Sequence, residues 1–318
     1  MESIYWVVSR DCNQRCRHCY NNSEPGAEGL SREEVDRVVD HFPTAFPIGR
    51  IILSGGEVLH WPELLFHTLG RLRGRYGDAV PLWIQTNGDL LDEVMLDRLL
   101  EAHVRHISVS GMDEYHPKST LRRGPYLEAL LRSRGIVVAQ EPGSAPRDYS
   151  VWGATPDSWV GKIWPRGRAL ETRSTHAGPD DDFCNRWSGA VNFLETNSQG
   201  SEVNIQLAAV YPCCPMTVRP LGDLRLEALE TILDRCRSNP VYRALNRGRP
   251  EEMGVHLGIS VEHARERTRA LGNCCLWCDE FFTVHYAGPR ESEAARIPGG
   301  RRDLVPVSRI LGLAATVT

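Results

Sequence analysis

The sequence has no long hydrophobic run, no excess of basic charge and no export signal at its start. Its 318 residues carry 37 Lys and Arg against 41 Asp and Glu, for a formal net charge of -4. No basic field therefore points to nucleic acid or an anionic membrane as a partner. No apolar stretch reaches the roughly 18 residues that a membrane helix needs. The opening MESIYWVVSRDC lacks the basic start and apolar core of a secretory signal, so we expect a soluble, cytoplasmic protein.

Cysteine is missing from the central part of the chain, and the ten cysteines fall into an N-terminal and a C-terminal group. In a chain without an export signal, such groups favour metal sites over disulfides. The first group is Cys12, Cys16 and Cys19, whose C-x3-C-x2-C spacing is not the paired C-x2-C arrangement of a zinc finger. Three thiolates on one loop can instead ligate three irons of a 4Fe–4S cluster and leave the fourth iron open to a ligand.

Short apolar runs alternate with amphipathic stretches through the first half, which is the pattern of β/α units. Strands are expected at residues 4–9, 50–54, 80–85, 104–110, 135–140 and 149–152. Helices are expected at 31–41, which opens with an SREE capping box, and at 62–76, 92–102 and 126–134. These units predict an α/β fold, namely a partial (β/α)6 TIM-like barrel over residues 1–175 followed by a small α+β domain over residues 176–318.

Distinctive residues follow four of the expected strands, and in a parallel barrel such positions share one end. The segment CNQRCRHCY occupies residues 12–20, SGGE residues 54–57, QTNG residues 85–88 and SVSGMDEYH residues 108–116. Taken together, in this order and at these strand ends, the motifs of the first half resemble those of the radical S-adenosylmethionine (SAM) superfamily.

The resemblance implies a cofactor set for this end of the barrel. Cys12, Cys16 and Cys19 would ligate a 4Fe–4S cluster whose open iron is chelated by the amine and carboxylate of SAM. Electron transfer into SAM would then release a 5′-deoxyadenosyl radical, which is chemistry that belongs to the cofactor.

The resemblance also implies which residues contact SAM. Gly55 and Gly56 would let the methionine part approach the backbone, and Glu57 would accept a hydrogen bond from its ammonium. Asn87 and Ser110 would bind the ribose or the carboxylate, and Tyr20 would lie near the adenine. Arg168, in the segment WPRGRAL, would bind the SAM carboxylate or clamp the seam between the domains. The alternative for Arg166 and Arg168 is a simple ion pair with acidic neighbours.

The second cysteine group resembles a twitch domain, a relative of the SPASM domain that holds one auxiliary 4Fe–4S cluster. A β-hairpin is expected to end at Cys213, and the implied ligands are Cys184, Cys213, Cys275 and Cys278. Cys214 could replace Cys213, and Cys274 could replace Cys275. A structural zinc on the same four thiolates is the alternative, because spacing does not separate iron from zinc.

Cys236 lies in the expected helix 224–237, away from both cysteine motifs. A free cysteine there is either a small buried apolar residue or a thiol that gives a hydrogen atom to a substrate radical. In the loop after the fourth strand, His116 is a candidate substrate contact together with Asp113 and Glu114. His18, inside the cysteine loop, is expected to form a hydrogen bond rather than to ligate a metal.

These observations predict a radical SAM enzyme that abstracts a hydrogen atom from a carbinol C–H bond of a small sugar-, nucleoside- or aminoglycoside-type molecule. Epimerisation with Cys236 as the hydrogen donor is the favoured outcome. Oxidation of a secondary alcohol, with the auxiliary cluster as electron acceptor, is the main alternative. Sulfur donation or substrate binding by that cluster is a third, and peptide modification a fourth, disfavoured because no leader-binding domain precedes the barrel.

A non-catalytic zinc-binding interaction protein is the alternative from another class, although it does not account for GGE and TNG at strand ends. The expected partners are a small-molecule substrate and an external electron donor such as flavodoxin or ferredoxin. Neither nucleic acid nor a membrane is expected as a partner.

Overall fold

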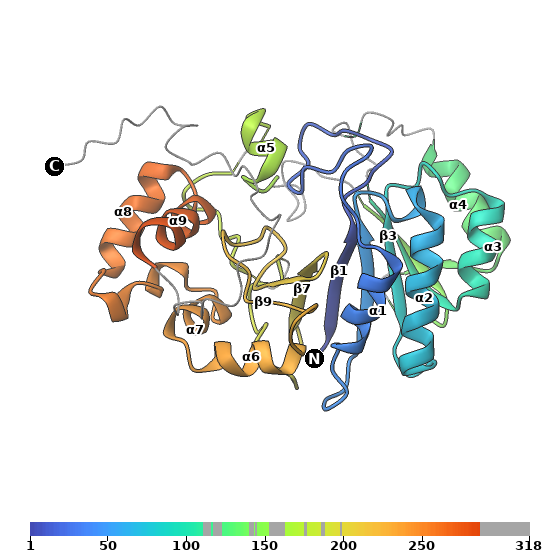
Figure 1. The fold of residues 1–318 in the computed structure, drawn as a ribbon. Helices are drawn as coiled ribbons and strands as arrows, with labels where there is room; N and C mark the ends of the chain where they lie inside the picture. The colour runs from blue at the N-terminus through green and yellow to red at the C-terminus, as the bar shows by residue number, and fades with distance from the viewer. Residues whose placement is uncertain are drawn as a thin grey trace.

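The computed structural model describes residues 1–110, 116, 123–139, 143, 145–152, 163–174, 177–185, 188–197 and 199–286. Its strands form one sheet in the order β5-β6-β4-β3-β2-β1-β7-β8-β9 (Figure 1). The strands are β1 (Ser3–Ser9), β2 (Arg50–Gly55), β3 (Leu82–Thr86), β4 (Val104–Ser110), β5 (Val137–Val138), β6 (Asp148–Trp152), β7 (Glu202–Gln206), β8 (Ala209–Tyr211) and β9 (Gly222–Asp223). All pairs from β5 to β7 are parallel, and only the β7–β8 and β8–β9 pairs are antiparallel. The open parallel sheet confirms the α/β fold class.

Four helices follow strands and lie on one face of the sheet (Figure 1). They are α1 (Arg32–Asp40), α2 (Pro62–Tyr76), α3 (Glu93–Glu101) and α4 (Arg123–Ser133). The expected capping box is present, since the Ser31 side chain accepts from the backbone of Glu34 and the Glu34 side chain accepts from that of Ser31. In the described part of the chain, no helix is long and apolar enough to cross a bilayer.

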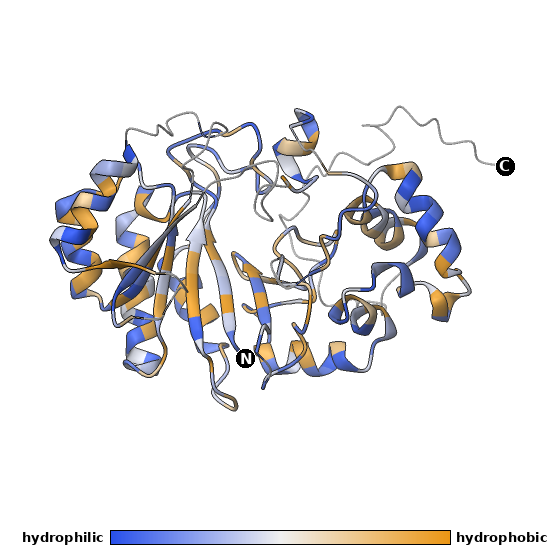
Figure 2. Ribbon diagram, turned by 180° about the vertical axis from the view of Figure 1, so that it is seen from behind, coloured by the Kyte–Doolittle hydropathy of each residue, from blue (hydrophilic) through white to orange (hydrophobic). Residues whose placement is uncertain are grey.

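The two faces of the sheet differ in chemistry, as the alternating colours along the strands in Figure 2 illustrate. The helix-covered face is apolar: Trp6 on β1 packs on Phe42 with 5.1 Å between the ring centroids. On β3, Leu82 and Ile84 are buried in this core, whereas Trp83 and Gln85 point to the opposite face and are partly exposed. We call this opposite side the inner face. Parallel strands usually bury apolar residues on both faces, so a polar, partly exposed face indicates a surface built for a ligand.

Strand register stacks the inner face into layers. The middle layer consists of Tyr5, Ile52, Trp83, His106, Asp148 and Asn204. The upper layer, one step closer to the carboxyl ends of the strands, consists of Val7, Ser54, Gln85, Ser108, Ser150 and Gln206. Five of the six upper-layer side chains carry uncharged hydrogen-bonding groups.

The C-terminal half shares the sheet and the main core with the first half. The expected hairpin before Cys213 is present as β7 and β8, but β7 also pairs in parallel with β1, with Tyr5 opposite Asn204. Leu229 and Trp277 of the C-terminal half belong to the same buried cluster as Trp6. Residues on both sides of position 175 therefore share one sheet and the larger hydrophobic core, and the expected division into two domains stays a prediction.

The remaining helices lie on the inner-face side of the sheet (Figure 1). They are α5 (Gly167–Glu171), α6 (Leu229–Arg237), α7 (Pro240–Asn246), α8 (Val261–Leu271) and α9 (Cys274–Glu280), with the short turns η1 (Val58–His60), η3 (Pro250–Glu252), η4 (Val255–Leu257) and η5 (Phe281–His285).

The strand order differs from a simple succession of β/α units at one edge. The fifth expected strand, 135–140, is reduced to the two exposed residues of β5, and β6 pairs between β4 and β5. β6 therefore takes the position beside β4 that consecutive order would give to β5. The pairing is selected by long-range contacts such as the one between His106 and Asp148, which local periodicity does not encode.

Glu202, at the lower end of the inner face, gives stability a specific pH dependence. Its carboxylate accepts a hydrogen bond from Ser3 Oγ at 2.7 Å, and burial raises its pKa from the ordinary 4.5 to about 7. The unfolded chain loses this proton at lower pH than the folded chain, so stability falls as pH rises from about 4.5 to about 7. As pH rises over this range, we expect the free energy of unfolding of Glu202→Gln to increase relative to that of the natural protein, by at most about 3 kcal/mol at pH 8.

Urea unfolding between pH 4 and pH 8 measures this gain. Glu101→Gln, at an exposed position of α3, is the control and should show no such trend. A difference between Glu202→Gln and the natural protein that does not change with pH would contradict the assignment.

Candidate active site and second cysteine site

The N-terminal cysteine loop follows β1 at the carboxyl edge of the sheet. Cys12 and Cys16 are buried, and Cys19 is partly exposed. Two backbone amides already point at the sulfurs, since Gln14 N donates to Cys12 Sγ at 3.4 Å and Ser23 N donates to Cys19 Sγ at 3.3 Å. Amide donors of this kind stabilise thiolates, which is the form that ligates iron.

Gly55 and Gly56 let the second strand's end pack against this loop. A Cβ on Gly56 would lie 2.4 Å from the Asp11 carbonyl oxygen, and one on Gly55 would lie 2.7 Å from the Ser9 carbonyl oxygen. The amide of Gly56 donates to Ser9 O at 2.8 Å. We expected these glycines to admit the methionine part of SAM; in the structure, what they admit is the backbone of the cysteine loop.

Glu57 connects the second and third strand-end loops. Its carboxylate accepts from Thr86 Oγ1 at 2.7 Å, from the amide of Asn87 at 2.6 Å and from the amide of Leu59 at 2.9 Å. Burial raises the pKa of this carboxyl, although these donors oppose the shift. These contacts of Glu57 join parts of the chain to one another, and its expected hydrogen bond to the ammonium of SAM stays a prediction.

Asn87 and Ser110 lie where the sequence predicted, at the ends of β3 and β4. The Asn87 amide nitrogen donates to Asn13 of the cysteine loop at 2.9 Å, so three strand-end loops meet here. Ser110 Oγ donates to the Thr86 carbonyl at 3.4 Å. Their roles as SAM ligands also stay predictions.

Two polar residues of the cysteine loop were missed by sequence reasoning. Asn21 and Ser23 are 5% and 4% exposed, and among the described residues their side chains have no hydrogen-bond partner. Buried polar groups are normally paired, so both side chains are suited to bind a group that fills this end of the barrel. The only signal in the sequence was their position directly after Tyr20.

Arg168 clamps the cysteine loop. It is 4% exposed and donates to the Cys16 carbonyl at 2.8 Å and to the Ser23 carbonyl at 3.1 Å. Gly167 allows this approach, because a Cβ there would lie 2.4 Å from the Tyr20 carbonyl oxygen. These contacts, together with an ion pair to Glu24 at 3.2 Å, hold the cysteine loop and do not cross the seam between the halves, so both expected roles of Arg168 stay predictions.

Tyr20 lies at the junction with the C-terminal half. Its hydroxyl is 3.0 Å from Cys214 Sγ, and its ring meets that of Trp164 edge-on with 4.8 Å between centroids. Tyr5, whose hydroxyl donates to Ser54 Oγ at 2.7 Å, lies in the same buried network. This network connects Cys214 to the inner face, while the expected contact of Tyr20 with adenine stays untested.

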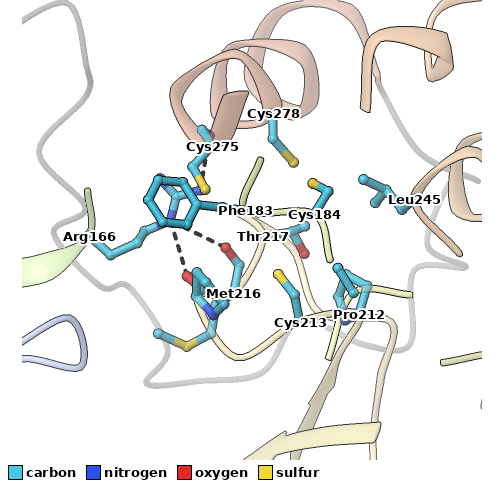
Figure 3. Close-up of a pocket in the computed structure, with 12 residues that line it drawn as sticks. Arg166, Phe183, Cys184, Pro212, Cys213, Met216, Thr217, Leu245, Cys275 and Cys278 are labelled. Carbon is cyan, nitrogen blue, oxygen red and sulfur yellow. Dashed lines mark hydrogen bonds between the residues drawn. The ribbon is translucent and has the colours of Figure 1, made fainter. Parts of the chain in front are cut away.

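Four residues of the second cysteine group line one small cavity. The sulfurs of the four expected ligands point toward the same space (Figure 3). They come from three separate stretches of chain and are Cys184, Cys213, Cys275 and Cys278.

The alternative ligands differ in their surroundings. Cys214 turns to Tyr20 instead of the cavity. Cys274 donates to the Asp181 carbonyl at 3.6 Å and also contacts the thiols of Cys184 and Cys275, so it stays an alternative to Cys275.

Arg166 supports this cavity with a buried positive charge. Its guanidinium forms a two-pronged ion pair with Asp279, at 2.8 and 3.0 Å, and donates to the Cys275 carbonyl at 3.0 Å. The expected pairing with an acidic neighbour is thus present, although here it is buried. The hydrogen bond with Cys274, followed by burial, raises the pKa of the Cys275 thiol, and burial raises that of Cys213; the charge of Arg166 opposes both shifts.

The four thiols around the cavity could hold either a single zinc ion or a 4Fe–4S cluster. Within the described ranges, no three His, Cys, Asp or Glu side chains are placed to hold a single metal ion. Four thiolates on one zinc would have to converge, since Zn–S bonds are about 2.3 Å long. Four thiols around one cavity can also ligate a cubane cluster, and a zinc ion on the same thiolates stays the alternative.

Cys236 is not brought together with the rest of the predicted site. It lies on α6, is 1% exposed and belongs to the main hydrophobic core. Figure 1 shows α6 at the opposite end of the molecule from the cysteine loop. Burial raises the pKa of the Cys236 thiol to about 12. This position corresponds to the buried apolar role for Cys236, and its assignment as a hydrogen donor stays a prediction.

Of the fourth strand-end loop, His116 is described and lies edge-on to His18, with 4.6 Å between ring centroids. Asp113 and Glu114 lie outside the described residues.

Comparison with known proteins points to one superfamily. Residues 6–132 match the sequence profile of the radical SAM superfamily. An Fe-coproporphyrin III synthase of Methanosarcina barkeri is 32% identical over 147 residues, which cover 44% of this chain and 34% of that protein. An AdoMet-dependent heme synthase of the same organism is 33% identical over 114 residues, which cover 34% of this chain and 30% of that protein. The matches therefore span about a third of the length of these relatives.

Solved structures give weaker similarities. BtrN in complex with AdoMet and 2-DOIA has a TM-score of 0.49 and 16% identity, covering 79% of this chain and 89% of that one. The anSMEcpe protein with bound AdoMet and the Cp18Cys peptide has a TM-score of 0.48 and 14% identity, covering 84% of this chain and 95% of that one. No functional argument rests on these similarities.

The contact at Gly56 makes a testable prediction. Gly56→Ala places a methyl group against two loop carbonyls, so we expect a loss of about 1–3 kcal/mol of stability and a displaced cysteine loop. Iron bound after anaerobic reconstitution should fall to about half, with the far-ultraviolet circular dichroism unchanged. Gly70→Ala on α2, where a Cβ meets nothing within 4 Å, is the matched control and should keep full iron. Full iron in Gly56→Ala would refute the role of this contact.

Proposed function

We propose that this chain, a radical SAM protein over residues 6–132, oxidises a secondary alcohol of a small sugar-, nucleoside- or aminoglycoside-type molecule. The observation that carries the proposal is the pairing of two features. One is the set of four thiols around one cavity, and the other is a polar, uncharged upper layer on the inner face, below the cysteine loop.

The chain supplies ligands for two groups. Cys12, Cys16 and Cys19 would hold the first, and the four cysteines of the cavity would hold the second. When bound, the first group and SAM supply a 5′-deoxyadenosyl radical that takes the carbinol hydrogen atom, and the second supplies a one-electron acceptor. The chain itself fixes the loops: Glu57, Asn87 and Arg168 hold the strand-end loops together through buried hydrogen bonds.

The polar side chains of the upper layer favour a substrate that carries hydroxyl groups. Gln206 is 1% exposed and, within the described part of the chain, has no hydrogen-bond partner for either side-chain atom. Gln85 and Ser54 already share hydrogen bonds with Tyr5. A molecule with several hydroxyl or amino groups would pair such amides and hydroxyls, whereas an apolar molecule would leave them unpaired.

The names of the relatives point to iron-tetrapyrrole products, Fe-coproporphyrin III and heme. Since the matches cover only 34% and 30% of those proteins, the substrate proposed here is argued from this chain's own residues.

Epimerisation is the second candidate, and Cys214 is the observation that favours it. Cys214 is 5% exposed, and its thiol is hydrogen-bonded to the Tyr20 hydroxyl. Tyr20 is in turn hydrogen-bonded to Tyr5 on the inner face. Burial raises the pKa of this thiol well above its ordinary value, so it keeps the hydrogen that a donor must carry. An external reductant such as flavodoxin or ferredoxin would supply electrons in either case.

One experiment separates the two outcomes. The anaerobically reconstituted protein is given reductant, SAM and a panel of sugars, nucleosides and aminoglycosides in deuterated water. We expect 5′-deoxyadenosine and a ketone. Deuterium at an inverted carbon, lost in Cys214→Ala, would establish epimerisation instead. If no alcohol in the panel stimulates the formation of 5′-deoxyadenosine, the proposed function is wrong.

The second cysteine site has its own test. Cys184→Ala should reduce bound iron from about eight to about four atoms per chain, because one of two 4Fe–4S clusters is lost. Iron analysis and the visible absorption spectrum measure this loss. Cys236→Ala is the matched control and should keep all the iron, since Cys236 lies in the apolar core. Bound zinc, or iron unchanged in Cys184→Ala, would contradict the assignment.

A further inference from the structure

A carboxylate, an imidazole and a hydroxyl lie in line on the inner face. His106, on β4, pairs through Nδ1 with Asp148 Oδ1 at 2.5 Å, and its Nε2 lies 3.0 Å from Ser150 Oγ. His106 and Asp148 are each 1% exposed, whereas Ser150 is partly exposed. The proposed function gives His106 and Asp148 no role, and no sequence motif marks them because β4 and β6 are far apart in the chain.

The hydrogen bonds around Asp148 indicate which nitrogen of His106 carries the proton. Asp148 Oδ2 accepts from the amide of Ala145 at 3.2 Å, which leaves Oδ1 to accept the Nδ1 proton of His106. Nε2 is then the free acceptor, and the Ser150 hydroxyl donates to it. Burial lowers the pKa of His106 against the opposing effect of Asp148, so the imidazole is neutral and can accept a proton.

The other groups around His106 are few. The ring of Trp83, the middle-layer residue of β3, is tilted against that of His106 at 42°, with 4.5 Å between centroids. The guanidinium carbon of Arg50, on β2, lies 4.5 Å from the centroid of the Trp83 ring, and the charge of Arg50 lowers the pKa of His106. The charged groups that face His106 are therefore Asp148 from β6 and Arg50 from β2.

Ser150 is the member of this hydrogen-bonded series that a substrate on the inner face would contact. It belongs to the upper layer, beside Ser108 on β4, while His106 and Asp148 lie one layer deeper. Ser150 Oγ therefore lies between the buried imidazole of His106 and the space above the upper layer, where the proposed function places the substrate.

We propose that Ser150 and His106 form a proton relay that takes the hydroxyl proton of the substrate during alcohol oxidation, with Asp148 as the positioning residue. The inference rests on the proposed function. After hydrogen abstraction, the O–H bond of the carbinol radical breaks and the C=O double bond forms. The proton passes to Ser150 Oγ as Ser150 gives its own proton to His106 Nε2. The unpaired electron leaves to a one-electron acceptor of the iron–sulfur class, and the imidazolium is stabilised by Asp148.

The first test is the ratio of ketone to 5′-deoxyadenosine in the reconstituted full-length protein. In His106→Gln, hydrogen abstraction continues but proton removal fails, so we expect this ratio to fall roughly 10²-fold, in the usual range for loss of a general base. Ser150→Ala should lower it less, because the substrate hydroxyl can still approach the imidazole through water. His67→Gln removes a surface imidazole that pairs with Asp36 at 2.8 Å on the helix side, and it is the matched control.

The second test is the pH profile of ketone formation, which a purely structural role would not move. The rate should fall as pH drops through the pKa of His106. Asp148→Asn removes a group that raises this pKa, so the falling limb should shift to lower pH. If His106→Gln misfolds, Ser150→Ala and this shift still decide the matter.

The outcomes separate this inference from the proposed function. A natural protein that forms no ketone overturns the proposed function. A natural protein that forms ketone, with an unchanged product ratio in folded His106→Gln or Ser150→Ala, or an unshifted pH limb in Asp148→Asn, overturns the relay alone.

Discussion

The structure depends on the docking of the cysteine loop against the turn after β2. Gly56 touches the carbonyls of Arg10 and Asp11 at distances that leave no room for a side chain, and Glu57 connects the same turn to the loop after β3. The Gly56 contact joins backbone to backbone, so it depends on no side chain, whereas the Glu57 contact is made by its carboxylate. Three thiols that would be mobile on an unsupported loop are thereby held at the carboxyl edge of the sheet.

A second constraint connects the two cysteine sites. Arg168 donates hydrogen bonds to carbonyls of the cysteine loop. Arg166, two residues earlier, donates to Asp279 and to the Cys275 carbonyl beside the cavity of the second cysteine group. Arg168 is buried, and the paired side chains of Arg166 and Asp279 are only 11% and 17% exposed, so losing one member of that pair is costly. One short segment at the start of α5 therefore sets the position of each site relative to the other.

Much of this could be predicted from the sequence, and the failures have physical causes. The α2 helix and β4 match their expected bounds because proline, periodicity and alternation are local signals. The insertion of β6 beside β4 and the parallel pairing of β7 with β1 depend on contacts between distant segments, which no local pattern carries. The resemblance to a twitch domain implied four thiols and left two alternatives open, but only the fold shows that Cys214 contacts Tyr20. Cys236 looked available in sequence because burial is not visible there.

The central claim is that the thiols of the N-terminal loop make this chain a SAM-cleaving enzyme. The most direct measurement is the amount of 5′-deoxyadenosine and methionine formed from SAM by the anaerobically reconstituted protein under a strong reductant, compared with Cys16→Ala. The account predicts cleavage by the natural protein and none above background by Cys16→Ala. Intact SAM with the natural protein, or equal cleavage by the two proteins, would contradict it.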